Sequence, residues 1–291
     1  MNSKSGVIIG LEVHTEINTN TKLFCGCPTK GSEEPNTRVC ETCLGHPGSK
    51  PVLNKKAVEY ALKLCLALNC KISKELIFSR KSYFYPDMAK NYQISQYEIP
   101  LGSNGNLKLR SGKEIGITRV HMEEDPASLV HPSGMQESAY VLVDYNRSGN
   151  PLLEIVTEPE LESAAEARDF MKHLITILDY LGIFDVNKGI IKADANVSIK
   201  ESRFVKQEVK NITGFKEIER ALNYEIIRQK EAVKESKKIH GQSPVSTPWI
   251  QQETRAWDSE KGITFTLRKK ETEEDYGYIL DPDLVKTEIN K

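Results

Sequence analysis

The segment PLLEIVT, residues Pro151–Thr157, decides the fold that we expect for this chain. A run this apolar, with Glu154 at its centre, predicts a strand that is covered on both faces. On either side of it in the sequence, other stretches alternate apolar and polar residues with a period of two, which is typical of half-buried strands. These stretches are residues 6–14, 114–121, 140–145, 191–199 and 263–267.

Three helices are expected between the strands. Asn54 is a suitable N-cap for a helix that runs to about Leu68. Ser163 and Glu166 form a capping box before an amphipathic helix, and a third helix is expected over residues 215–238. Strand hairpins between grouped helices, rather than strict alternation of strand and helix, predict an α+β fold with a largely antiparallel sheet. The remaining polar segments, residues 234–248 and 271–275, are expected to be a surface loop and a solvated acidic turn.

The composition excludes some classes of protein. The chain has 291 residues, and its 41 acidic residues balance its 40 lysines and arginines, so it does not bind nucleic acid by bulk positive charge. The balanced charge does not exclude a local basic patch. The mean hydropathy of −0.46, with no long apolar run, excludes a membrane-spanning segment. Residues 1–16 pass directly into a strand pattern and do not resemble a signal peptide, so we expect a cytoplasmic globular protein.

Four of the six cysteines occur within nineteen residues, as Cys25-Gly-Cys27 and Cys40-Glu-Thr-Cys43. Paired cysteines separated by a polar loop suit the tetrahedral coordination of Zn²⁺ by four thiolates. Four protein ligands close the coordination sphere, so the expected site is a structural zinc knuckle over residues 24–48. The alternatives are four reduced thiols or two disulfides. The other two cysteines, Cys65 and Cys70, are expected to be packing residues.

Acidic side chains occur within the strand patterns, where an unpaired carboxylate is costly to bury. They are Glu12, which shares a strand face with His14; the run Glu123, Glu124 and Asp125; Glu154; and Asp194. Each needs a cation nearby, and the sequence leaves open whether this is a basic side chain or a divalent metal ion. For Asp194 the alternative to a metal ion is a salt bridge to Lys192 or Lys210.

Three or four carboxylates together with ATP phosphates suit Mg²⁺, whereas His14 favours Mn²⁺ or a contact through water. Glu123 and Glu124 point to opposite faces of a regular strand, so one of them reaches a given ion. Basic residues near these segments suit the binding of phosphate groups: Arg80, Lys81, Arg119, Arg147, Lys192 and Lys210. The sequence contains no glycine-rich nucleotide loop, so any bound ATP would lie on the sheet.

Several segments carry a resemblance to one family. They are GLEVH (10–14), RKSYFYPDMAKNYQISQ (80–96), HMEED (121–125), LVDYNRSGNPLLEIVTEPE (142–160), DANVS (194–198) and ETR (253–255). Together they resemble the GatB family, the B subunits of the tRNA-dependent aspartyl/glutamyl-tRNA amidotransferases.

The resemblance implies a cradle-like catalytic domain over residues 1–291, related to glutamine synthetase and the guanido kinases, with the zinc knuckle inserted. It also implies that the C-terminal helical and tail domains of the family are absent from this chain. The implied activity is that of a ligase. ATP phosphorylates the side-chain carboxylate of Asp-tRNA(Asn) or Glu-tRNA(Gln), and ammonia then displaces phosphate. The implied partners are a glutaminase (A) subunit, a small C subunit and the misacylated tRNA.

The resemblance also implies roles for individual residues. The catalytic and magnesium-binding set is Glu12, His14, Glu124, Glu154 and Asp194, with Glu123 as a further partner of the metal. The nucleotide-binding set is Lys81, Arg119, Asn146, Arg147, Lys192 and Asn196.

The chain departs from the family pattern at two positions. Glu160 follows Pro159 where the family has aspartate, and Gly277 stands where many members have arginine. Two other classes of function stay open on the residues alone. One is a non-catalytic RNA-binding module, and the other is a glutamine-synthetase-like ligase that acts on a small molecule.

Overall fold

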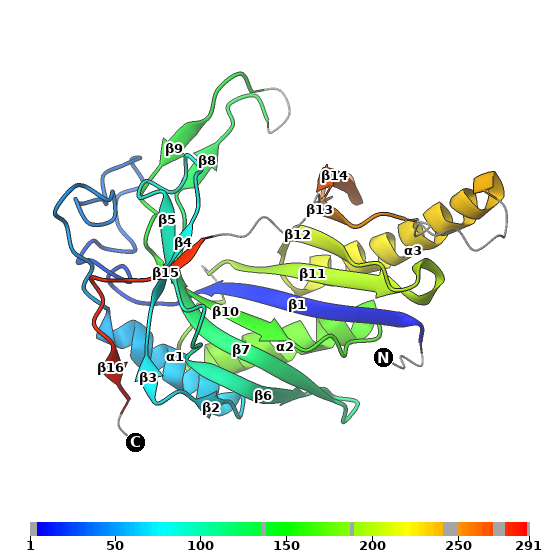
Figure 1. Ribbon diagram of the computed structural model, residues 1–291, viewed down its shortest axis with the longest axis horizontal. Coiled ribbons are helices and arrows are strands. Elements are labelled where there is room, and N and C mark those ends of the chain that lie inside the picture. Colours follow the sequence, from blue (N-terminus) through cyan, green and yellow to red (C-terminus); the bar gives the residue numbers. More distant parts are fainter. Residues whose placement is uncertain (1–4, 135–137, 187–188, 241–249, 270–276, 290–291) are drawn as a thin grey trace.

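The computed structural model describes residues 5–134, 138–186, 189–240, 250–269 and 277–289. Within these residues, nine strands form one twisted sheet (Figure 1). Its strand order is β14 (Ile263–Lys269), β13 (Glu253–Asp258), β12 (Gln207–Thr213), β11 (Ile191–Ile199), β1 (Val7–Glu16), β10 (Pro151–Thr157), β7 (Glu114–Glu124), β6 (Gly102–Lys108) and β2 (Lys71–Ile72). Neighbours are antiparallel except for the parallel pair β12–β13, so the expected α+β fold with a largely antiparallel sheet is confirmed.

Three described helices cover one face of this sheet: α1 (Lys55–Ala67), α2 (Ala164–Tyr180) and α3 (Phe215–His240) (Figure 1). Alternate residues of the central strands point toward the helices and are fully buried, as Leu11 and Val13 of β1 are. The opposite side chains of the same strands point to the open face. The sheet therefore separates a hydrophobic core from a polar surface.

The predicted caps of the first two helices are confirmed. Asn54 Oδ1 accepts hydrogen bonds from the backbone N–H groups of Lys56 and Ala57. Ser163 Oγ accepts the N–H of Glu166, whose carboxylate in turn accepts the N–H of Glu162. These contacts satisfy N–H groups that have no partner within the helix.

The predicted third helix, over residues 215–238, is confirmed as α3, which extends two residues further. The overlapping prediction of a surface loop over residues 234–248 is wrong in part, because residues 234–240 are the last turns of α3. The lysines and glutamate of this stretch are good helix formers, and Val233 is buried just before it. Residues 241–248 of the expected loop and the acidic run 271–275 lie outside the described residues.

Smaller sheets stand at one end of the main sheet. The strands β15 (Tyr278–Leu280), β4 (Ser79–Ser82) and β5 (Tyr92–Ser95) form a three-stranded sheet beside the end of β7 (Figure 1). The hairpin of β8 (Ser128–Val130) and β9 (Leu142–Asp144) rises from the same end, and β16 (Thr287–Glu288) pairs with β3 (Glu75–Leu76). This end wall and the open face of the large sheet together surround a cavity.

Two irregularities in strand pairing determine which side chains face that cavity. In β7, Ile117 pairs with Thr157 and Arg119 pairs with Val156, so Thr118 is one residue more than its partner strand has. Because of this bulge, Ile117 and Val120 both point to the core, three residues apart. The residues that follow, Arg119, His121 and Glu123, consequently face the cavity.

The second irregularity lies opposite Asp194. Ala193 pairs with Ile212 and Ala195 pairs with Val209, so two residues of β12, Lys210 and Asn211, face one residue of β11. Asn211 takes a left-handed backbone conformation, with a φ of 65°. The bulge directs its N–H toward Asp194.

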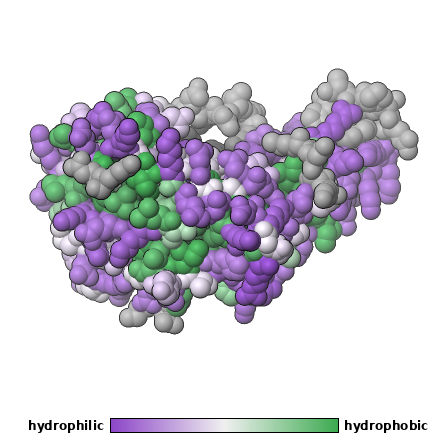
Figure 2. Space-filling model, turned by 90° about the horizontal axis from the view of Figure 1, so that it is seen from below, coloured by the Kyte–Doolittle hydropathy of each residue, from purple (hydrophilic) through white to green (hydrophobic). Residues whose placement is uncertain are grey.

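The surface seen from below is mainly hydrophilic, with separate patches of hydrophobic side chains (Figure 2). No helix in the described part of the chain is both long enough and apolar enough to cross a membrane.

Candidate active site and metal centre

The cavity over the open face has a volume of about 750 Å³. Charged residues of both signs line it. The acids are Glu12, Glu16, Glu123, Asp125, Glu154 and Asp194, and the bases are Lys81, Arg119, Arg147, Lys192 and Lys210. The other polar residues of the lining are His14, His121, four tyrosines (Tyr83, Tyr85, Tyr97 and Tyr278), Gln93, Ser95, Gln96, Asn211 and Thr254.

His14, Glu154 and His121 lie side by side because their three strands pair in register. Glu154 of β10 is the Cα partner of His14 on β1 and of His121 on β7. His14 Nε2 lies 3.4 Å from Glu154 Oε2 and 3.6 Å from Glu123 Oε1. His121 Nε2 lies 3.3 Å from the same Glu154 oxygen. Ligand atoms of His14, Glu123 and Glu154 all lie within 4.8 Å of one another, close enough to hold one metal ion.

The protonation of this cluster reflects its crowding. Burial alone would lower the pKa of His14, but the hydrogen bond to Glu154 and the charges of Glu123, Glu154 and Asp194 outweigh burial and raise it to about 9. Burial tends to raise the pKa of Glu154, whereas His121 and His14 hold it well below its ordinary value. Burial and then the charge of Glu154 raise the pKa of Glu123. Two carboxylates this close favour a positive charge between them, which a protonated His14 or a divalent cation can supply.

Glu124 does not join this group, although it was expected among the metal ligands. Its carboxylate oxygens lie 2.5 and 2.7 Å from Lys90 Nζ, and one of them also accepts the N–H of Ile94 at 2.8 Å. Side chains alternate along β7, so Glu123 faces the cavity and Glu124 faces away from it. Glu123, expected only as a further partner, takes the place beside His14 and Glu154.

Glu12 and Asp194, which are Cα partners across β1 and β11, also line the cavity but are not among the three residues whose ligand atoms converge. Asn196 Nδ2 donates to Glu12 Oε1 at 2.9 Å. Asp194 Oδ2 lies 3.0 Å from Lys210 Nζ, and its Oδ1 accepts the N–H of Asn211 at 3.1 Å. The salt bridge that the sequence left open for Asp194 is therefore formed, with Lys210 as the partner.

The expected nucleotide-binding residues divide into two groups. Lys81, Arg119, Arg147 and Lys192 line the cavity, and Arg119 Nη2 lies 3.7 Å from Glu154 Oε1. Arg147 donates to the carbonyl oxygens of Pro126 and Ala127 and lies 3.3 Å from Asp125. Asn146, by contrast, is buried and does not line the cavity. Arg80, noted for its charge, forms ion pairs with Asp281 and Asp283 instead.

The sequence predicted no role for His121 and marked Asp125 only as an acid that needs a nearby cation, and both are buried and line the cavity. Strand alternation was the signal for His121, because it lies two residues before Glu123 on the same strand. Asp125 follows the end of β7, and its partner Arg147 is distant in sequence.

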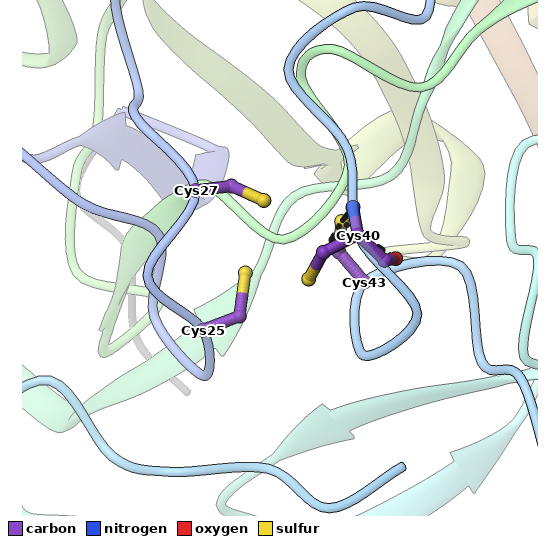
Figure 3. A group of neighbouring side chains, drawn as sticks. All are labelled: Cys25, Cys27, Cys40 and Cys43. Atoms are coloured by element: carbon purple, nitrogen blue, oxygen red, sulfur yellow. Dashed lines mark hydrogen bonds between the residues drawn. The ribbon is translucent and has the colours of Figure 1, made fainter.

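The four cysteines Cys25, Cys27, Cys40 and Cys43 converge from two facing loops (Figure 3). Their sulfur atoms all lie within 4.8 Å of one another. The pKa of Cys43 is lowered to about 5, mainly because the Cys25 thiol donates a hydrogen bond to it. Burial opposes this shift, and Lys22 makes a smaller contribution in the same direction as Cys25. The cluster has the donor set of a tetrahedral zinc site, and a thiolate is the form that binds zinc.

A fully buried lysine supports a negative charge at this cluster. Lys22 has no exposed surface, and its Nζ lies 3.7 Å from Cys43 Sγ and 3.3 Å from the carbonyl oxygen of Tyr145. A buried ammonium group needs a nearby anion, and four neutral thiols or two disulfides would not supply one. A zinc ion with four thiolates carries a net negative charge and would supply that anion.

Comparison with known proteins identifies relatives of the chain. A family profile described as "GatB/GatE catalytic domain" matches residues 7–291. Three curated proteins, each named as the B subunit of an aspartyl/glutamyl-tRNA(Asn/Gln) amidotransferase, are similar to it. The one from Carboxydothermus hydrogenoformans is 46% identical over 293 residues, which cover 98% of this chain and 59% of the relative. The one from Saccharolobus solfataricus is 51% identical over 286 residues, which cover 96% of this chain and 58% of the relative.

The third relative, from Methanoregula boonei, is 48% identical over 284 residues, covering 96% of this chain and 56% of its own length. The chain thus spans somewhat more than half the length of these relatives. The match extends over the strands that carry the cavity and over the four-cysteine segment alike. The chain belongs to the GatB/GatE catalytic domain family.

Proposed function

We propose that this chain carries out the ATP-dependent chemistry of an aminoacyl-tRNA amidotransferase that acts on misacylated Asp-tRNA(Asn), Glu-tRNA(Gln) or both. One observation carries the proposal: His14, Glu123 and Glu154 converge in a large cavity that basic side chains also line. Acids that repel RNA make little sense on a surface that only presents tRNA. The relatives' name supports the choice of substrate.

The reaction has two steps. An oxygen of the amino acid's side-chain carboxylate attacks the γ-phosphorus of ATP, and ADP leaves. Ammonia then attacks the acyl carbon, and phosphate leaves with the bonding electrons and the surplus proton, which yields the amide. A glutaminase partner (A) subunit would supply the ammonia, and a small C subunit would complete the assembly.

The first step brings two negatively charged groups together and the second releases an anionic phosphate, so the principal task of the site is electrostatic. His14, Glu123 and Glu154 would hold the divalent cation, which is Mg²⁺, or Mn²⁺ if His14 binds it directly. The bound cation would neutralise charge on the transferred phosphoryl group. Arg119, fixed beside Glu154, and Lys81 would bind phosphate oxygens.

The other side of the cavity would bind the remaining parts of the reactants. Glu12 and Asp194 line the cavity there, Asn196 holds Glu12 by a hydrogen bond, and Lys192 lies next to His14 across the strand pair. Arg147 would meet the carboxylate or the nucleotide from the end wall. Glu124 is left out because Lys90 and a backbone N–H occupy its oxygens. The likeness to glutamine synthetase and the guanido kinases, with a cradle domain that holds a structural zinc knuckle, is part of this proposal.

The test is tRNA-dependent ATP cleavage and amide formation, measured with the chain assembled with its partner subunits and with each charged tRNA in turn. We expect both activities, and we expect Glu123→Gln to reduce them by at least roughly 10²-fold. Glu114→Gln, an exposed change on the same strand, is the matched control and should retain activity. Turnover on free aspartate or glutamate without tRNA would instead favour a small-molecule ligase, and tRNA binding without ATP cleavage would favour a non-catalytic role.

A further inference from the structure

The knuckle, residues 24–48, packs against the segment that delivers Arg147 to the cavity. That segment, here called the 143–150 loop, joins β9 to β10. Leu23, just before the knuckle, donates its N–H to the carbonyl oxygen of Gly149 at 2.9 Å. A Cβ atom at Gly149 would lie 3.6 Å from Cys43 Cβ, and Gly149 has a φ of +83°. Glycine is therefore suited to this position by its backbone conformation as well as by the close approach.

Two asparagines join the knuckle and the loop reciprocally. The side chain of Asn36, in the knuckle, donates to the carbonyl oxygen of Val143 at 3.1 Å and accepts the N–H of Tyr145 at 2.8 Å. The side chain of Asn146, in the loop, donates to the carbonyl oxygen of Glu34 at 2.7 Å and accepts the N–H of Arg38 at 2.8 Å. Each amide thus binds two backbone groups of the opposite segment, as a paired strand would.

Lys22 adds a third connection, and it reaches the cysteines directly. Its buried ammonium group lies between Cys43 Sγ and the carbonyl oxygen of Tyr145, which is in the loop. The same carbonyl oxygen accepts the N–H of Ser148, inside the turn that contains Arg147. The sulfur ligand, the lysine and the loop backbone therefore form one continuous chain of contacts.

We propose that Lys22, Asn36 and Asn146 are positioning residues that couple metal binding at the four-cysteine cluster to the placement of Arg147 in the cavity. This explains why Asn146, expected among the nucleotide-binding residues, is buried and does not line the cavity. A metal ion fixes the four sulfur atoms, and Lys22 and the two amides transmit that order to the loop. The proposal rests on the proposed zinc site but not on the proposed reaction.

Metal removal from the unmodified chain is the first test. Hydrogen exchange of residues 143–150 is compared in zinc-loaded and chelator-stripped protein, with β11 as the internal reference. We expect stripping to speed exchange in the loop roughly 10-fold, the scale of losing one or two hydrogen bonds, and to leave β11 unchanged. Labelling of Arg147 by phenylglyoxal should rise in parallel. Uptake of neither Zn²⁺ nor Co²⁺, or a loop insensitive to metal removal, would overturn the proposal.

Reciprocity supplies the second test, because a loop that senses the metal must also affect metal affinity. Asn146→Asp keeps the acceptor for Arg38 but loses the donor to Glu34. We expect it to weaken Co²⁺ binding, followed by the thiolate absorption bands, by roughly 3- to 10-fold. Lys22→Met should weaken it at least as much. A role confined to loop structure would leave cobalt affinity unchanged.

The matched control is Asn69→Asp, which removes a comparable amide hydrogen bond, to Asn106, at an exposed site outside the knuckle and the loop. Cobalt affinity should be unchanged in this variant. Equal affinities of Asn146→Asp, Lys22→Met and Asn69→Asp would refute the coupling. None of these measurements uses tRNA or ATP. The coupling can therefore be confirmed even if the chain has no transamidation activity, and it can be refuted even if that activity is found.

Discussion

Replacing Asp194 by asparagine tests what this carboxylate does in the cavity. Asparagine keeps the size of the side chain and an oxygen that can accept the N–H of Asn211, but it removes the charge that lies 3.0 Å from Lys210 Nζ. A role in holding a cation predicts unchanged or higher stability, because the acid is crowded by other acids. A role in an ion pair predicts lower stability, because Lys210 loses a partner. The geometry favours the second outcome.

The exposure of the pair sets the magnitude. The side chains of Lys210 and Asp194 are 32% and 16% exposed, between a surface pair and a buried one. Surface pairs contribute about 0.2–1 kcal/mol, and breaking a buried pair costs about 3–5 kcal/mol. Lys210 keeps a second carboxylate, because Glu208 Oε1 also lies 3.0 Å from its Nζ. We therefore expect Asp194→Asn to lower the free energy of unfolding by about 1–2 kcal/mol.

Urea unfolding of Asp194→Asn, Lys210→Met and the double variant measures this loss and its origin. If the two side chains act through each other, the losses of the single variants should not add in the double variant. Asp179→Asn, an exposed change on α2, is the control and should shift the free energy of unfolding by no more than about 0.5 kcal/mol. A variant Asp194→Asn as stable as the unmodified chain, or fully additive losses, would refute the reasoning.

Three further outcomes follow from other contacts. Glu124→Gln leaves the largely buried Lys90 without its carboxylate, so the free energy of unfolding should fall by about 3 kcal/mol. Mg²⁺ affinity, measured by titration calorimetry, should be unchanged, and a loss of Mg²⁺ binding would show that Glu124 belongs to the cluster of His14, Glu123 and Glu154. Cys40→Ser should reduce bound zinc from about one ion per chain to none and lower the melting temperature, and metal analysis that finds the zinc retained would exclude the four-thiolate site. Asn54→Ala removes the cap of α1 and should cost about 1 kcal/mol in urea unfolding, and an unchanged midpoint would show that the cap does not stabilise the helix.

Periodicity predicted five of the nine strands of the main sheet, whereas β13, β12, β6 and β2 were not predicted. The apolar run Pro151–Thr157 and the alternating run Ile191–Ile199 are strands with those bounds. Capping side chains gave the starts of α1 and α2 because a cap is a local property of a few residues. The end of α3 was predicted to within two residues, at residue 238 against His240, although the same lysine-rich residues were also interpreted as the start of a solvated loop.

Candidate site residues were predictable only where orientation follows from simple alternation. Glu12 and His14 were placed on one face correctly because β1 is regular. Alternation itself showed that Glu123 and Glu124 face opposite ways, but it did not show which one meets His14. That choice depends on the bulge at Thr118, whose mark in the sequence is the three-residue spacing of the apolar Ile117 and Val120. Asn146 was misplaced because its hydrogen bonds are made with residues more than one hundred positions away.

The bulge in β7 also constrains the length of that strand. Removing Thr118 alone would leave every chemically important side chain in place along the sequence, and it would restore regular pairing with β10. Ile117 and Val120 would then be two residues apart and would both still point to the core, so Arg119, His121 and Glu123 would keep their side of the sheet. The irregularity would pass to β6 instead, where Asn104 lies between the partners of Arg119 and Ile117 and would lose the residue opposite it. The bulge therefore gives β7 one residue that it can lose without exchanging the two faces of the sheet, whereas a deletion that leaves the bulge in place would turn every later side chain of the strand to the other face.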